Sequence, residues 1–285
     1  MNRRVFFLVT VDGDLRVGTP DQQRAGVLAM RGVHRQLGLF SRTTWMINEL
    51  DFHWTQQHPE LLLDLVASGE CIGVHDHLDT HYAESYALAL DLIRQSKSTL
   101  EGFYCRAGQL VSVRSHRNGC ALQSEAWYRA LKDVGYAEVS DVWPGVAWSG
   151  RMVCDGPPPN PWRRLEAGDP GAIAMDNRMI PLTALPWRHD PANWLDYHSR
   201  SGCFVQVPIT SMPLVDRQRF EQAADSGQPL VFLLVDTHPY DMQDPSTGDV
   251  SPERLQEYKA SLEWVRQTFQ AELIRLDQVR GLLPS

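Results

Sequence analysis

The sequence predicts an α/β fold in which about seven or eight β/α units form one barrel or near-barrel domain over residues 1–285. Short runs of β-branched and aromatic residues alternate with segments of helical hydrophobic spacing along most of the chain. The connections between them are short, as in parallel β/α units. A chain of 285 residues also has the length at which such barrels form a single domain.

The first half of the chain follows this alternation closely. Pro59 suits the first turn of a helix, and Ser124 suits an N-cap. Helices are expected over residues 22–37, 60–68, 84–100 and 124–134. Strands are expected over residues 4–11, 43–47, 71–75, 102–106 and 136–140.

The second half begins with a segment of different character. Residues 143–196 hold many prolines and tryptophans, too many large apolar side chains for a solvated linker. We expect an irregular insertion of the single domain there. The alternation then resumes, with strands expected over 203–209, 229–235 and 272–276 and helices over 216–224 and 252–270.

Composition excludes several classes of function. The net charge is -8 and the pI about 5.7, so nucleic acid and anionic membranes are poor candidate partners. No apolar run approaches the length of a membrane span. The five cysteines are scattered and odd in number, which argues against a disulfide framework. Reduced thiols and the lack of a visible secretory signal lead us to expect a cytoplasmic protein.

Two aspartates follow the first predicted strand. Asp12 and Asp14 are two residues apart, so in extended chain their side chains point to the same side. Active-site residues of β/α barrels lie at the carboxyl ends of strands. Neighbouring carboxylates are both ionised only near a cation or strong donors, although Asp-Gly is also a common turn pair.

Histidines gather at the end of the third predicted strand and just after it. His75, His77 and His81 fall within seven residues, and neutral imidazole is a common ligand of zinc. His77 and His81 would share one face of a helical turn, whereas His75 and His77 would share one face of a strand. The cluster favours metal binding over a group of solvated histidines.

Two further polar residues follow predicted strands. Arg106 ends the strand expected over 102–106, where its guanidinium could hold a carboxylate in a bidentate contact. His238 follows the strand expected over 229–235 and is a candidate general acid. Taken alone, either residue could equally belong to an ordinary surface loop.

In this order, the motifs resemble those of the polysaccharide deacetylase family, the NodB-type sugar deacetylases of carbohydrate esterase family four. The matching segments spread over almost the whole chain and comprise residues 10–14, 70–81, 106–108 and 236–239. The Asp-x-Asp form at residues 12–14 is similar to a subgroup that includes intracellular and peptide-like amide hydrolases.

The resemblance implies a distorted (β/α)7 barrel with a bound divalent metal. It implies Asp12 as the catalytic base, Arg106 as the residue that orients Asp12, and His238 as the general acid. It also implies Asp14 as a metal ligand beside two histidines. Zn²⁺ is the default ion for such ligands, with Co²⁺, Ni²⁺ or Fe²⁺ as alternatives.

The choice of histidines leaves an alternative open. The preferred pair is His77 and His81, which has the family's His-x-x-x-His spacing. The family's usual position for the first histidine would instead select His75, with Asp79 as its partner four residues later. A carboxylate can replace an imidazole on zinc, so this second pair remains chemically acceptable.

The resemblance further implies an N-deacetylase. The expected substrate is a small or lipid-linked N-acetylated amino sugar of O-antigen-like surface polysaccharide synthesis, contacted by Trp143 and Tyr240. A rival interpretation is a hydrolase of another non-peptide amide C–N bond, which would share every motif. A third is a non-catalytic carbohydrate-binding relic of the fold, which would need neither base nor acid.

Overall fold

The computed structural model describes residues 3–77, 85–119, 123–149, 152–154, 162–164, 174–193 and 196–283. Within these ranges, seven parallel strands form one curled sheet, in the spatial order β12-β1-β2-β3-β4-β5-β11. They are β1 (Arg4–Asp12), β2 (Thr43–Ile47), β3 (Cys71–Asp76), β4 (Ser115–Asn118), β5 (Glu138–Val139), β11 (Phe204–Gln206) and β12 (Leu230–Thr237).

The two ends of this sheet meet beyond β11. The chain bends after β11, and the amide N–H of Thr210 donates to the carbonyl oxygen of Leu234 in β12 at 2.9 Å. A parallel bridge between Ser211 and Val235 follows. The sheet therefore closes unevenly, and the prediction of a distorted (β/α)7 barrel is confirmed.

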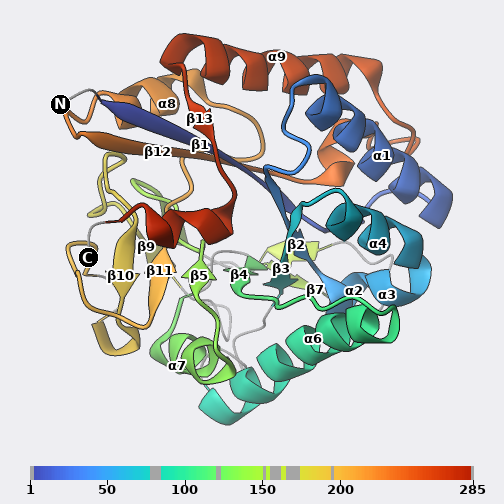
Figure 1. Ribbon diagram of the computed structural model, residues 1–285, viewed down its shortest axis with the longest axis horizontal. Coiled ribbons are helices and arrows are strands. Elements are labelled where there is room, and N and C mark those ends of the chain that lie inside the picture. Colours follow the sequence, from blue (N-terminus) through green and yellow to red (C-terminus); the bar gives the residue numbers. More distant parts are fainter. Residues whose placement is uncertain are drawn as a thin grey trace.

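Helices surround the sheet on its outside (Figure 1). They are α1 (Pro20–Gln36), α2 (Glu49–Phe52), α3 (Trp54–Gln57), α4 (Pro59–Ala67), α6 (Tyr86–Arg106), α7 (Glu125–Val134), α8 (Arg217–Ala224) and α9 (Pro252–Phe269). The described parts of the chain also include the 3₁₀ turns η2 (Pro191–Asn193), η3 (Pro239–Met242) and η4 (Leu276–Gly281). No helix among the described residues is long and apolar enough to cross a membrane.

Short strands account for the remaining pairing. The strand β10 (Trp187–His189) extends the sheet antiparallel to β11, and β13 (Glu272–Leu273) pairs with β1. Within 143–196, β6 (Ala147–Ser149) pairs with β9 (Ala174–Asp176), and β7 (Met152–Cys154) pairs with β8 (Trp162–Arg164). The described parts of this segment are thus not wholly irregular, and its status as an insertion stays a prediction.

Side-chain alternation along the strands builds two apolar layers. Phe6 and Leu8 of β1 belong to a cluster inside the barrel, together with Phe232 of β12. Phe7 and Val9 belong instead to the larger core between the sheet and the helices. Because β-strand side chains alternate, β1 and β12 each contribute to both layers, and the interior is a packed core rather than a channel.

One predicted strand is wrong. Residues 102–106 do not form a strand but the last turns of α6, which runs from Tyr86 to Arg106. Leu100 and Tyr104, four residues apart, are both buried on one face of this helix, so the helical spacing continues through the aromatic run. Gly108, with φ +76, accommodates the left-handed backbone after the helix end.

The strand that takes its place in the sheet is β4, which the sequence did not suggest. All four of its residues, Ser115, His116, Arg117 and Asn118, are polar and yet buried. A buried strand normally appears as an apolar run, so polar side chains conceal this one.

The packing of Phe6 gives a first prediction. Phe6 is fully buried, and its ring stacks on Phe232 with centroids 5.0 Å apart. Phe6→Ala should lower the free energy of unfolding by about 3–5 kcal/mol, because it leaves a cavity in the apolar cluster inside the barrel. Urea unfolding measures the change, with Leu110→Ala, at a residue 98% exposed, as the control. An equal effect of the two substitutions would contradict a packed barrel interior.

Candidate active site

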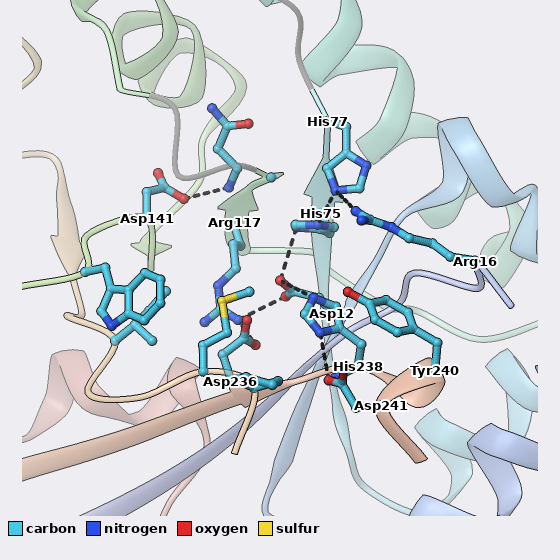
Figure 2. Close-up of a pocket in the computed structure, with 16 residues that line it drawn as sticks. Asp12, Arg16, His75, His77, Arg117, Asp141, Asp236, His238, Tyr240 and Asp241 are labelled. Atoms are coloured by element: carbon cyan, nitrogen blue, oxygen red, sulfur yellow. Dashed lines mark hydrogen bonds and ion pairs between the residues drawn. The ribbon is translucent and has the colours of Figure 1, made fainter. Parts of the chain in front are cut away.

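Polar side chains gather where the barrel strands end. Along β1 and β12, the inward-facing positions change from phenylalanine and leucine to Asp12, Asp236 and, after β12, His238. His75 of β3 and His77 just beyond it face the same space (Figure 2). Because parallel strands end at one edge of the sheet, these side chains line a single cavity of about 380 Å³.

Gly13 sets the positions of the two aspartates. Its N–H donates to the carbonyl oxygen of Met46 at 2.7 Å, and its own carbonyl oxygen accepts from Nε1 of Trp54 at 2.7 Å. A Cβ at this residue would lie only 3.0 Å from the Met46 oxygen. The close approach of two backbones therefore explains the glycine between Asp12 and Asp14.

Asp14, His75 and His77 form a group of candidate metal ligands. One ligand atom from each lies within 4.8 Å of the others. Nε2 of His77 is 3.3 Å from Oδ2 of Asp14, and Nε2 of His75 is 3.7 Å from Oδ1. The two imidazole Nε2 atoms are 2.9 Å apart. Imidazole nitrogens and a carboxylate oxygen converging in this way fit zinc and similar divalent ions.

Burial and charge set the protonation of these three groups. Burial lowers the pKa of His75 to about 3, so its ring is neutral. Burial also opposes the charge of His77, but the carboxylates of Asp14 and Asp51 outweigh it and raise its pKa to about 10. Burial would raise the pKa of Asp14, yet His77, Arg16 and His75 hold it well below its usual range. A bound cation would replace the proton of His77.

The α2 segment orients the group from outside. Oδ2 of Asp51 lies 2.8 Å from Nδ1 of His77, which leaves Nε2 pointing toward Asp14. Nδ2 of Asn48 donates to Oδ1 of Asp14 at 3.0 Å and to Asp51 at 2.9 Å. Carboxylate–histidine contacts of this kind fix the orientation of metal-binding imidazoles.

Gly119 lies against the Cδ2 edge of the His77 ring. A Cβ at this position would lie 1.7 Å from Cδ2 of His77, far inside contact distance. The residue that follows β4 must therefore be glycine if His77 is to keep its place beside Asp14.

Arg117 of β4 holds Asp12. Its Nη1 donates to Oδ1 of Asp12 at 3.0 Å, to Oγ1 of Thr10 at 2.9 Å and, in a short contact, to Oδ1 of Asp236. The other side of the guanidinium donates to the carbonyl oxygen and Oγ of Ser140. The guanidinium, only 2% exposed, is thus fixed from both sides, and it fixes the Asp12 carboxylate in turn.

Asp236 is a second carboxyl group beside Asp12. Burial raises its pKa to about 7; Arg117 acts against this rise, and Asp12 adds to it. Asp12, Asp236 and His238 form another cluster with the spacing of metal ligands. Because Arg117 already supplies a positive charge between the two carboxyl groups, this cluster needs no ion to be stable.

His238 faces Asp12 across the cavity. Its Nε2 lies 3.9 Å from Oδ2 of Asp12, and its Nδ1 lies 2.9 Å from Oδ2 of Asp241 in η3. Burial lowers the pKa of His238, but the carboxylates of Asp241, Asp236 and Asp12 outweigh it and raise the pKa to about 9. The ring is therefore a cation at neutral pH, with Nε2–H directed into the cavity.

Two aromatic side chains line the cavity. The Tyr240 ring stacks on His238, with centroids 4.5 Å apart at 21°. Trp143 lines another part of the cavity wall near Asp141, whose pKa burial raises to about 6. The structure thus places both predicted substrate-contacting residues, Trp143 and Tyr240, at the cavity.

The prediction for Arg106 is wrong. This residue is exposed at the end of α6 and does not contact Asp12, whereas Arg117 does. The error follows from the wrong strand over 102–106: a helix end on the surface cannot direct a side chain into the barrel. The sequence carries no signal for Arg117, because its strand is polar throughout.

The structure describes one residue of each alternative ligand pair, His75 and His77. His75 and His77 lie together beside Asp14, so they are neighbours and not competitors for one position. His81 and Asp79 lie outside the described residues. Other site residues have no motif in the sequence: Asn48 is the N-cap of α2, Asp51 lies in α2, and Asp241 is recognisable only as the third residue after His238.

Arg117 and Arg106 give a paired prediction. Arg117→Met should lower the free energy of unfolding by about 3–5 kcal/mol, because Asp12 and Asp236 would lose their buried cation. Arg106→Met should change it by less than about 0.5 kcal/mol, since its side chain is exposed. Guanidinium chloride unfolding of both variants measures the difference, and similar effects would contradict the assigned contacts.

No family model and no curated protein matches the chain. Solved structures do. A protein described as a polysaccharide deacetylase from Mycobacterium smegmatis matches with a TM-score of 0.56 and 13% identity, over 99% of this chain and 91% of that one. The family-four esterase domain of a xylanase from the Trinervitermes trinervoides hindgut metagenome matches with a TM-score of 0.50 and 10% identity, over 99% and 91%.

A third match is a 4-α-glucanotransferase from Thermococcus litoralis, with a TM-score of 0.53 and 12% identity, over 99% of this chain and 41% of that one. Proteins with this fold thus catalyse different reactions, and sequence identities this low establish similarity of fold only. The chain has the β/α barrel fold of the polysaccharide deacetylases.

Proposed function

We propose that the protein is a metal-dependent hydrolase that removes an N-acetyl group from an amino sugar. The observation that carries the proposal is the pairing of Asp12 and His238, a carboxylate and an imidazolium 3.9 Å apart, in the same cavity as Asp14, His75 and His77. Amide hydrolysis needs a base, an acid and a means of activating water, and these three parts stand together here.

The donor set fits a divalent ion. His75 is neutral, His77 directs Nε2 toward Asp14, and Asp51 supports His77 from behind. We therefore assign Asp14, His75 and His77 as ligands, with Zn²⁺ as the first candidate ion. When bound, such an ion supplies Lewis-acid chemistry, which lowers the pKa of water and polarises a carbonyl group.

The protein's own groups carry the proton transfers. Asp12, held by Arg117, accepts a proton from the attacking water as the water oxygen bonds to the acetyl carbon. His238 gives its Nε2 proton to the amide nitrogen as the C–N bond breaks. The amide and one water thus become acetate and the free amine. Asp241 holds the other nitrogen of His238 and keeps the donating nitrogen directed at the cavity.

The substrate class rests on the cavity walls. Trp143 and Tyr240 offer aromatic surfaces on which a sugar ring can stack, and Asp141 adds a carboxylate near Trp143. We infer that the substrate is an N-acetylated sugar, small or lipid-linked, of surface polysaccharide synthesis. We also infer that the protein acts on it in the cytoplasm.

The direct test is a deacetylation screen. Zinc-loaded protein should release acetate and free amine in equal amounts from UDP-N-acetylglucosamine, its galactose epimer or N-acetylglucosamine oligomers. Asp12→Asn and His238→Gln should each lower the rate by about 10²–10⁴-fold, because each removes one proton transfer. Turnover of non-sugar amides alone would favour a different C–N hydrolase. Zinc binding without any turnover would favour a binding protein.

The position of Gly119 predicts a change in metal affinity. Gly119→Ala should weaken Zn²⁺ binding by about tenfold or more, because the new methyl group displaces His77. Gly32→Ala in α1 is the matched control, since nothing lies within 4 Å of a Cβ there. Competition with a chromophoric chelator measures both affinities, and unchanged binding in Gly119→Ala would remove His77 from the ligand set.

The charge of His238 predicts a pH dependence. Because the pKa of His238 is about 9 and the protonated ring is the acid, kcat/KM should fall as the pH rises through about 9. Asp241→Asn removes a carboxylate that raises this pKa, so the alkaline limb should move down by about one pH unit or more. The exposed Asp225→Asn variant is the charge-matched control. Coincident profiles would show that Asp241 does not tune the acid.

A further inference from the structure

Arg16 stands among the candidate metal ligands. It follows β1 in the loop before α1, and its Nη2 donates to Oδ2 of Asp14 at 2.6 Å. The same nitrogen lies 3.2 Å from Nε2 of His77. These are the atoms that would bind the ion, and Figure 2 shows the Arg16 side chain reaching toward His77.

The guanidinium and an ion cannot both occupy this place comfortably. Oδ2 of Asp14 and Nε2 of His77 are 3.3 Å apart. An ion about 2.1 Å from both atoms would lie within about 4 Å of Nη2, so a dication and a guanidinium would crowd one carboxylate oxygen. The Asp14 oxygen would have to give up one of them.

Arg16 has a place to go. Its side chain is 26% exposed, whereas that of Asp14 is fully buried. Its guanidinium carbon lies 5.5 Å from the centroid of the Tyr240 ring, and both residues line the cavity. Rotation of the side chain can therefore carry the charge away from Asp14 toward solvent while it stays near an aromatic face.

Resting on the ligand set of the proposed function, we propose that Arg16 is a resident cation of the metal site. In the metal-free protein, Arg16 pairs with Asp14, which is buried close to the carboxylates of Asp12 and Asp51. Binding of a divalent ion displaces it. Arg16 thus preserves the arrangement of the empty site and lowers its affinity for metal, because every ion must first break the Arg16–Asp14 ion pair.

Arg16→Gln tests this directly, with Zn²⁺ alone as the probe. The variant should bind Zn²⁺ about tenfold more tightly than the wild type in chelator competition, because no guanidinium competes for the Asp14 oxygen. Without metal it should melt at a lower temperature, since Asp14 is left without its guanidinium. The rise in melting temperature with saturating Zn²⁺ should therefore be larger in the variant.

Controls separate contact from net charge. Arg94→Gln makes the same charge change at an exposed site on α6, where the arginine side chain is 60% exposed, and should bind Zn²⁺ like the wild type. Crystal structures with and without Zn²⁺ should show Nη2 of Arg16 leaving Asp14 on loading. Equal affinities of Arg16→Gln and wild type, or an unmoved Arg16, would overturn this inference alone. If neither the wild type nor the Arg16→Gln and Arg94→Gln variants bound Zn²⁺, the proposed metal site would be overturned as well.

Discussion

The buried guanidinium of Arg117 ties together the strand ends on which the site is built. It comes from β4 and bonds to Asp12 of β1, Asp236 of β12 and Ser140 beyond β5. Two carboxyl groups this deep in a protein repel each other and lose hydration, so a shared cation is the condition for placing them there. Because the cation is planar and satisfied on both sides, it also fixes where the Asp12 oxygens point.

Three histidines of the site differ in charge because their surroundings differ. His75 has burial as its dominant influence and is neutral. His77 and His238 are equally buried, but each has a carboxylate on its far nitrogen, Asp51 for one and Asp241 for the other. Both of these rings are therefore charged, whereas the equally buried His75 is neutral. Neighbouring carboxylates thus decide the charge of each imidazole ring.

The site also depends on two glycines at which the backbone packs closely against a neighbouring segment or side chain. Gly13 lets the loop after β1 lie against β2, and Gly119 leaves room for the His77 ring. At both places the missing Cβ is what brings residues from separate strands within reach of one another. The positions of Asp14 and His77 therefore depend on the absence of a side chain at Gly13 and Gly119, as well as on hydrogen bonds.

The sequence by itself determined the alternation of strands and helices, because buried strands and amphipathic helices leave distinct hydrophobic periods. It also indicated that Asp12, Asp14 and the histidines at the end of β3 lie close together, since residues at strand ends share one edge of a barrel. Tertiary structure alone decided that Arg117 and not Arg106 holds Asp12. A polar strand has no apolar signature, and the contacts of Arg117 span more than a hundred residues of sequence. Long-range charge pairing of this kind exists only once the barrel has closed.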